Sequence, residues 1–275
     1  MKTGRIAKLT VSMSLVIVMF ILLRLIVIKI DDADKSTLGK LLENEQAMSL
    51  IPDFESFANV AEKKQAFFDY LRPAIRHQNA IITDERHFLI QSTQHLVDGL
   101  TLTEAEQFRI EEIANKYQYS HRSITVKTLN KLLNRADIIP ESMVLIQAAN
   151  ETGWGSSRFA KEGFNFFGQW CFKQGCGLVP QSRTAGKTHE VAAFDSVADS
   201  VASYMKNLNS NAAYSLLRSI RADLRSQDKL PVADQLVYGL VNYSERQEAY
   251  IDELLVMLRQ NKQYLVENHE ERPSI

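Results

Sequence analysis

The sequence predicts a mainly α-helical protein with one small β-hairpin, preceded by an N-terminal helical region and a membrane anchor. An apolar stretch near the N-terminus predicts the anchor. Apolar residues at helical spacing through most of the remaining chain predict the helices, and a short strand-like run after a turn-rich segment predicts the hairpin. With 275 residues and 45% apolar content, the chain is long enough for one sizeable core together with an anchor and a stalk.

Residues 1–30 differ in composition from the rest of the chain. An apolar stretch runs from residue 9 to residue 28, and as a helix rising about 1.5 Å per residue it matches the roughly 30 Å hydrocarbon core of a bilayer. Arg24 lies near its outer end, where the side chain can reach water. Basic residues precede the stretch and acidic residues follow it. We therefore expect a bacterial envelope protein, anchored in the inner membrane through residues 9–28, with its body in the periplasm.

A cleaved secretory signal is the alternative to an uncleaved anchor, and it also exports the body. The small residues of an Ala-x-Ala-like cleavage site are missing, because Asp31 stands two residues before Ala33. Residues 1–30 carry five basic and no acidic side chains, so a net charge of −1 for the whole chain leaves −6 on residues 31–275. An acidic body without a basic cluster argues against nucleic acid as a partner.

The two cysteines, Cys171 and Cys176, enclose four residues directly after Trp170. In an oxidising compartment they are candidates for a disulfide worth roughly 2 kcal/mol, which would stiffen this segment. Two reduced thiols or half of a metal site are the weaker alternatives. The spacing is not Cys-x-x-Cys, and the sequence has neither a His-Glu-x-x-His motif nor calcium-spaced carboxylates. We expect no metal and no cofactor.

Residues 31–58 are expected to form a linker or stalk, and residues 59–138 a helical region. A capping box, Thr103 with Glu106, marks one helix start in this region. Four apolar faces recur at helical spacing, and we expect them to form core. Their members are Phe67, Phe68, Leu71 and Ile75, then Ile81, Ile82, Phe88, Leu89 and Leu96, then Phe108, Ile110 and Ile113, and finally Leu129, Leu132 and Leu133.

Residues 139–265 are expected to form the domain that carries the chemistry, followed by a flexible tail at 266–275. Pro140 suits the first position of a helix, and Gly153 suits the left-handed residue that ends it. Glu151 then lies in the last turn, where the helix dipole and burial both raise the pKa of a carboxyl group. A carboxylic acid that stays protonated near neutral pH can act as a general acid. The alternative is a surface glutamate at a frayed helix end.

Both tryptophans of the chain lie within twenty residues of Glu151, where flat rings and amide side chains suit an enzyme that grips a sugar. Trp154, Phe167 and Trp170 are candidates for sugar stacking, although Trp154 and especially Phe167 are also suited to packing beneath Glu151. Asn165 and Gln169 are candidates for hydrogen bonds to the sugar. Residues 188–194 complete the expected hairpin, and helices are expected at 196–208, 216–224, 232–241 and 249–258.

Four ordered motifs resemble the glucosaminidase family of peptidoglycan hydrolases, glycoside hydrolase family 73. They are Glu-Thr-Gly-Trp-Gly-Ser-Ser from Glu151, Asn-Phe-Phe-Gly from Asn165, Phe-Asp-Ser from Phe194 with Tyr204 downstream, and Asn-Tyr-Ser from Asn242 with Tyr250 downstream. The resemblance covers roughly residues 139–258. It implies a lysozyme-like α+β fold with a small β-hairpin beside the cleft, and hydrolysis of the β-1,4 bond between N-acetylglucosamine and N-acetylmuramic acid.

The resemblance also implies catalytic roles. Glu151 matches the family's catalytic acid. Glu190 on the predicted strand is the first choice for a second carboxylate, with Asp195 as the alternative, although capping a helix is the plainer role for Asp195. If Glu190 lies too far away, the substrate's own acetamido group is the alternative nucleophile, positioned by Tyr243. The chain departs from the family pattern at Ser244 and in its cysteine-bounded ring, which leaves a core role for Tyr243 open.

Three functions remain open from the sequence. The first is a glycosidase that cleaves peptidoglycan as an endo-β-N-acetylglucosaminidase. The second is a lytic transglycosylase, in which Glu151 serves as both acid and base and the product is a 1,6-anhydro sugar. The third is a scaffold that binds peptidoglycan without cleaving it, which the intact Glu-x-Gly-Trp-Gly motif argues against.

Overall fold

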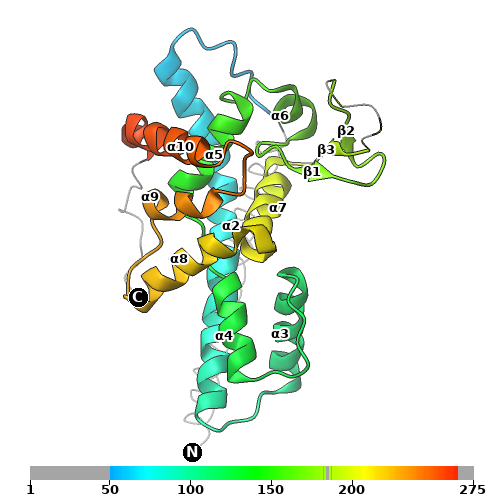
Figure 1. Ribbon diagram of the computed structural model, residues 1–275, viewed down its shortest axis with the longest axis vertical. Coiled ribbons are helices and arrows are strands. Elements are labelled where there is room, and N and C mark those ends of the chain that lie inside the picture. The colour runs from blue at the N-terminus through cyan, green and yellow to red at the C-terminus, as the bar shows by residue number, and fades with distance from the viewer. Residues whose placement is uncertain (1–49, 182, 184–185, 187, 266–275) are drawn as a thin grey trace, which may run out of the picture. The chain divides into compact units, whose positions relative to one another are not determined.

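A computed structural model describes residues 50–181, 183, 186 and 188–265 (Figure 1). From Ile51 onward the chain forms one compact unit. Helices dominate this unit, and a small antiparallel sheet lies at one side of it. The mainly α-helical prediction is therefore confirmed for the described residues. No helix among them is long and apolar enough to cross a membrane, and the predicted anchor, the first nineteen residues of the predicted stalk (31–49) and the predicted tail (266–275) lie outside them.

Helix α2, Val60–Val97, is the central element of the unit. It is 38 residues long, and the side chain of Asn59 caps its first turn by accepting a hydrogen bond from the amide of Ala61. The first two predicted apolar faces both belong to this one helix, which continues through Pro73. Helix α2 contacts α4, α5 and α7, so elements from both halves of the chain pack on it (Figure 1).

Helices α3, Glu104–Lys116, and α4, Val126–Arg135, pack with the second half of α2. The predicted capping box is confirmed, because Thr103 and Glu106 each accept a hydrogen bond from the other's backbone amide. Phe108, which we expected on a buried face, is 67% exposed. The shared core is formed by Leu89, Ile110, Ile113, Ala114, Tyr117, Leu129, Leu132 and Ala136.

Helix α5, Glu141–Thr152, follows Pro140 and is buried along most of its length. It ends at Gly153, whose φ of 56° and ψ of 47° are left-handed, as predicted. The short helix α6, Arg158–Gly163, comes next, capped by Ser157.

The sheet has three short strands, β1 Trp170–Cys171, β2 Gly177–Leu178 and β3 Glu190–Ala192, in the order β1-β3-β2. Both pairings are antiparallel, with Trp170 opposite Val191 and Gly177 opposite Ala192. The predicted hairpin is thus a three-stranded sheet, because the segment that follows Trp170 also pairs with β3. A disulfide joins Cys171 to Cys176 across the loop between β1 and β2.

The remaining helices follow the predicted pattern closely. They are α7 Val197–Ser210, η1 Ala212–Tyr214, α8 Ser215–Ser226, α9 Ala233–Leu236, η2 Val237–Leu240, α10 Glu248–Gln260 and α11 Lys262–Leu265. Ser196, rather than Asp195, caps α7, since its hydroxyl accepts a hydrogen bond from the amide of Asp199.

Packing is continuous across the expected boundary between residues 138 and 139. The guanidinium of Arg221 on α8 is fully buried and donates to the backbone carbonyls of Asn134, Arg135, Asp137 and Ile138. Arg225 forms two further hydrogen bonds with the Asp137 carboxylate, at 3.0 and 2.7 Å. These bonds tie the end of the helical region to the domain that follows it.

Candidate active site

Glu151 lies in the last turn of α5, as predicted, and its side chain is half-buried. One carboxylate oxygen accepts a hydrogen bond from the Tyr250 hydroxyl at 2.8 Å. Tyr250 comes from α10 and is almost completely buried. Two elements that are far apart in the sequence therefore meet at this carboxyl group.

The Tyr250 hydroxyl belongs to a longer chain of buried hydrogen bonds. It accepts a hydrogen bond from the side-chain amide of Gln147 at 2.9 Å, and the Gln147 carbonyl in turn accepts one from the Tyr204 hydroxyl. Gln147 stands four residues before Glu151, so both side chains lie on the same face of α5. This chain orients the Tyr250 proton toward Glu151, because the other side of the hydroxyl already accepts a hydrogen bond.

The second carboxylate oxygen of Glu151 faces the backbone of Gly168. A methyl group at Gly168 would lie 3.3 Å from this oxygen, and the φ of Gly168 is +62°. A glycine therefore satisfies both the left-handed backbone and the close approach of the carboxylate. Gly168 belongs to the Asn-Phe-Phe-Gly motif, but the sequence did not indicate this contact.

Burial raises the pKa of the Glu151 carboxyl group above its ordinary value. The hydrogen bond from Tyr250 and the positive charge of Arg246 act against this shift, and the negative charge of Glu253 adds to it. The upward direction agrees with the prediction. The residues that bury the group differ from those expected, because Tyr250 and Gly168 contact it.

Trp154 and Phe167, both candidates for sugar stacking, pack within the fold. The Trp154 ring contacts Phe67 and Phe68 of α2 edge-on, with ring centres 5.8 and 5.2 Å apart, and the Lys64 amine lies 4.8 Å from its centre. The Phe167 ring is buried and stacks on Tyr204 at 4.0 Å. These contacts favour a packing role for both rings, which was the alternative that the sequence left open.

Tyr243 lies one ring away from the Glu151 site. Its hydroxyl donates to the backbone carbonyl of Phe167 at 2.6 Å, and its ring stacks on Tyr250 at 5.7 Å. Burial raises the pKa of the Tyr243 hydroxyl well above its ordinary value. These contacts favour a positioning role for Tyr243, since it contacts both Tyr250 and the loop that carries Gly168, and its part in catalysis stays a prediction.

The amide side chains of Asn165 and Gln169 are occupied by the protein itself. Asn165 is 1% exposed; its amide donates to the carbonyls of Gln169 and Ala192, and its carbonyl accepts from the amide of Gln169. Gln169 bonds to the backbone of Ser200 and the hydroxyl of Ser203. For Asn165 in particular, burial and full hydrogen bonding favour a structural role over the expected contact with a sugar.

Glu190 stands on β3, and its side chain is 5% exposed. Its two carboxylate oxygens accept hydrogen bonds from the amide of Gly175, in the loop closed by the disulfide, at 3.1 Å and from that of Gly177, at the start of β2, at 2.9 Å. These backbone bonds lower the pKa of the Glu190 carboxyl group. Its role as a second catalytic carboxylate stays a prediction, and the contacts favour a role in holding the loop.

Glu190 and the two cysteines also form the one group of candidate metal ligands in the described part of the chain. Their ligand atoms lie within 4.8 Å of one another. The two sulfurs are bonded to each other, however, so neither is a thiolate that could bind a metal ion.

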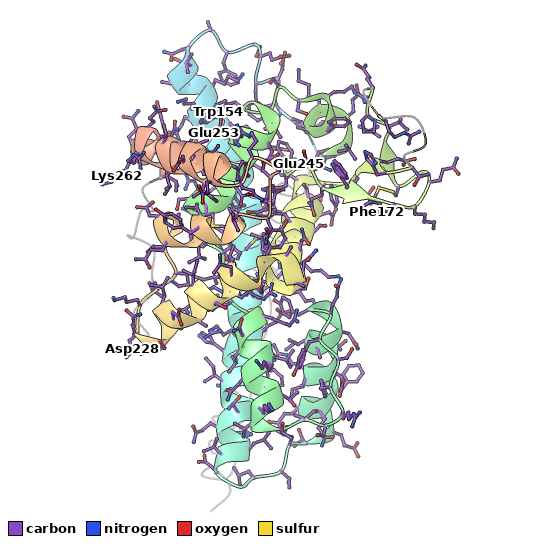
Figure 2. The ribbon with its side chains drawn as sticks, in the orientation of Figure 1. Trp154, Phe172, Asp228, Glu245, Glu253 and Lys262 are labelled. Carbon is purple, nitrogen blue, oxygen red and sulfur yellow. A yellow bond between two sulfur atoms is a disulfide. The ribbon has the colours of Figure 1, made fainter. Side chains whose placement is uncertain are left out.

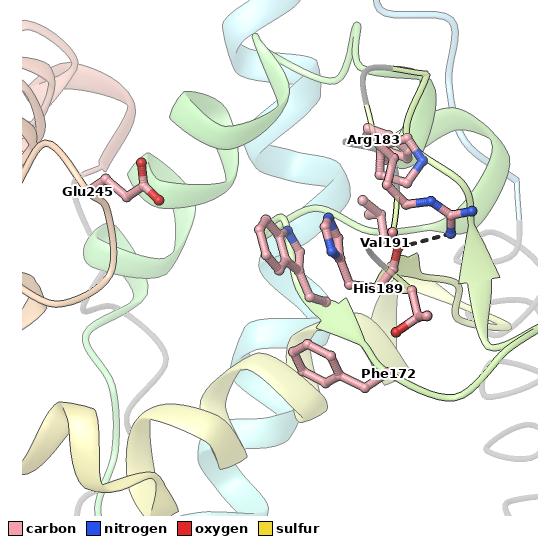
Figure 3. Close-up of a pocket in the computed structure, with 10 residues that line it drawn as sticks. Phe172, Arg183, His189, Val191 and Glu245 are labelled. Carbon is pink, nitrogen blue, oxygen red and sulfur yellow. Dashed lines mark hydrogen bonds between the residues drawn. The ribbon is translucent and has the colours of Figure 1, made fainter.

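Trp170 is the sequence-predicted aromatic residue that faces open space. It is 59% exposed, and its ring stacks on His189 at 4.3 Å with an angle of 9° between the planes. Together with Phe172 it lines a recess of about 700 Å³, which Glu245 borders on the opposite side from His189 (Figure 3). A flat, exposed ring beside a recess is suited to stacking on a sugar.

Glu151 is not among the residues that line this recess, but both sides of the recess lead to it. On one side, Trp170 follows Gly168 by two residues, and Gly168 faces the Glu151 carboxylate. On the other side, Glu245 directly precedes Arg246, whose charge acts on Glu151. Since consecutive Cα atoms lie about 3.8 Å apart, the Trp170 side of the recess begins close to the carboxyl group.

The sequence of the chain matches known proteins in two comparisons. The sequence model of the glucosaminidase family, described as mannosyl-glycoprotein endo-beta-N-acetylglucosaminidase, matches residues 126–264. The chain belongs to the glucosaminidase family. It is also 37% identical over 223 residues to protein bax of Escherichia coli strain K12, which covers 81% of this chain and 78% of the relative. No solved structure matches the chain. The family match begins within α4, ahead of the expected start at residue 139.

Proposed function

We propose that this member of the glucosaminidase family cleaves the β-1,4 bond between N-acetylglucosamine and N-acetylmuramic acid in peptidoglycan, with Glu151 as the general acid. The observation that supports this proposal most directly is the environment of Glu151. Burial raises the pKa of its carboxyl group, the Tyr250 hydroxyl holds one of its oxygens, and the other oxygen lies close to the Gly168 backbone. A general acid requires both a raised pKa and a fixed position.

In this mechanism the protonated Glu151 donates its proton to the glycosidic oxygen as the bond to the sugar breaks. The resulting carboxylate is stabilised by the Tyr250 hydroxyl and by the positive charge of Arg246. The exposed ring of Trp170 is the proposed stacking surface for a sugar of the glycan strand. We place this activity in the bacterial cell envelope, on a body anchored through residues 9–28.

Lytic transglycosylase chemistry is the second candidate, because the contacts of Glu190 favour a mechanism without a second carboxylate. A second carboxylate that activates water must be free to accept a proton, but both oxygens of Glu190 already accept backbone hydrogen bonds. If Glu190 stays bound to the loop, the sugar itself must supply the nucleophile. Its acetamido group then leads to hydrolysis, and its 6-hydroxyl leads to a 1,6-anhydro product.

The test is digestion of purified peptidoglycan by the full chain, with the ends of the products identified by mass spectrometry. Glu151→Gln keeps the shape of the side chain and an acceptor for Tyr250, but an amide is too weak an acid to protonate the glycosidic oxygen. We expect its kcat/KM to fall by about 10²- to 10⁴-fold, the usual contribution of a general acid. Glu162→Gln is the matched control, because Glu162 is an exposed residue of α6 that pairs with Arg158.

Near-normal cleavage by Glu151→Gln would remove Glu151 as the acid. A wild-type protein that binds peptidoglycan without releasing fragments would point to the scaffold function instead. Reducing ends of N-acetylglucosamine support the hydrolase, whereas 1,6-anhydro ends support the transglycosylase.

A further inference from the structure

A second recess, of about 430 Å³, adjoins the first one. Three separate segments form it: Gln118 after α3, the segment from Gln169 to Phe172, and one face of α7 with the residues that follow it. Its lining is mostly amide and hydroxyl side chains. Lys206 is the one charged residue among the described residues that line it.

Two of the polar groups in this recess are available to a ligand. Lys206 is exposed, and no carboxylate among the described residues pairs with its amine. Gln118 is also exposed, and its side-chain amide has no hydrogen-bond partner in the described part of the chain. Gln169 and Ser203, in contrast, are bonded to each other at 2.8 Å and form a fixed part of the wall.

The two recesses share a wall made of Trp170 and Phe172, whose side chains are 59% and 75% exposed. Figure 2 shows Phe172 beside the strands, on the loop that the disulfide closes. Gln169, which lines the second recess, directly follows Gly168 at the Glu151 carboxylate. A ligand that occupies the first recess near Glu151 can therefore extend a branch over the aromatic wall into the second.

We propose that the second recess binds the peptide stem that branches from N-acetylmuramic acid, with Lys206 pairing with a carboxylate of the peptide; this inference rests on the proposed function. A peptide offers backbone amides and free carboxylates, and the recess offers side-chain amides and one unpaired cation. Residues 31–275 carry a net charge of −6, so the net charge of this part of the chain does not attract an anionic peptide. Lys206 supplies a local attraction that selects the position of the carboxylate.

Gln118 shows which part of the chain contributes to this selectivity. It lies outside residues 126–264, the segment that matches the glucosaminidase family. Its backbone is left-handed, with a φ of +53°, and its backbone amide donates to the carbonyl of Asn115 at 3.1 Å, so the turn after α3 holds the residue in place. The helical region thus adds a side chain to a recess whose other walls belong to the family-matched domain.

The test measures binding of two soluble probes to the full chain by calorimetry. The probes are the methyl amide of N-acetylmuramic acid, whose lactyl carboxyl group is capped as it is by a peptide, and N-acetylmuramoyl-L-alanyl-D-isoglutamine. Glu151→Gln serves as the background in order to prevent turnover. We expect the peptide-bearing probe to bind at least about tenfold more tightly, and this difference to shrink as salt is added. Amidation of the terminal carboxylate should remove most of the difference.

Lys206→Ala and Gln118→Ala should each weaken binding of the peptide-bearing probe and leave binding of the uncharged methyl amide nearly unchanged. Lys229→Ala is the matched control, because Lys229 is exposed and bonds to Gln227 after α8. Equal affinity for both probes, or normal peptide binding by a folded Lys206→Ala variant, would overturn the inference. Failure of the wild type to cleave peptide-bearing peptidoglycan refutes the proposed function instead, whereas the comparison of the two probes reports on the second recess alone.

Discussion

Replacing Tyr250 with phenylalanine tests how the fold controls the proton of Glu151. The substitution keeps the ring that stacks on Tyr243 and removes the hydroxyl that links Gln147 to Glu151. Because that hydroxyl lowers the pKa of the Glu151 carboxyl group, its loss should raise the pKa further. A general acid works while it is protonated, so the alkaline limb of the pH profile of kcat/KM should move to higher pH.

The same substitution should also destabilise the protein. Gln147 is completely buried, and without the hydroxyl the bond that its amide donates to Tyr250 has no acceptor. A buried donor without a partner costs about 1–3 kcal/mol. For a domain of this size each kcal/mol lowers the Tm by about 2–4 °C, so we expect a fall of about 2–12 °C.

The assays are a pH series of peptidoglycan digestion and thermal unfolding followed by circular dichroism. Tyr238→Phe is the matched control, since Tyr238 lies on η2 and is exposed. It should change neither the Tm nor the pH profile. An alkaline limb that stays in place or moves to lower pH in Tyr250→Phe would refute the assignment of Glu151 as an acid governed by this hydroxyl.

Three further substitutions probe the surroundings of the site. Glu190→Gln should lower the Tm and reduce activity less than tenfold. Folding lowers the pKa of the Glu190 carboxyl group, so the carboxylate stabilises the protein at pH values above the pKa of the unfolded chain. The difference in Tm between wild type and variant should therefore shrink as the pH falls through the pKa of the folded protein. Gly168→Ala should lower kcat by roughly ten- to a hundredfold in digestion assays, because the new methyl group crowds Glu151, whereas Gly99→Ala, with a similar φ and open space around it, should affect only stability. Arg221→Met should cost about 3–5 kcal/mol in urea unfolding, because it removes a buried partner of the Asp137 carboxylate and the donor to the carbonyls of Asn134 and Ile138.

The local features that depend on a few neighbouring residues could be predicted from the sequence. The capping box at Thr103 and the left-handed Gly153 both follow from backbone geometry that recurs in unrelated proteins. The position of Glu151 in the last turn of α5 follows directly from Gly153. The family was recognisable because its motifs occur in a fixed order.

The partners of the site residues could not be predicted, because they come from distant parts of the chain. Trp154 packs on α2, about ninety residues earlier, and Tyr250 reaches Glu151 from α10, ninety-nine residues later. One clue was available: Gln147 stands one helical turn before Glu151, on a face that was otherwise apolar. A buried amide next to a candidate acid indicates that a further polar group must complete its hydrogen bonds.

The surroundings of Glu151 impose two opposite demands on one carboxyl group. A general acid must hold its proton in the free enzyme and release it during bond cleavage, so its pKa should be near the working pH rather than far above it. Burial supplies the upward shift, and Tyr250 and Arg246 limit it by stabilising the carboxylate that forms after proton transfer. A site with burial alone would hold the proton too tightly. The hydrogen-bonded chain from Tyr204 through Gln147 to Tyr250 is therefore as much a part of the proposed acid as the carboxyl group itself.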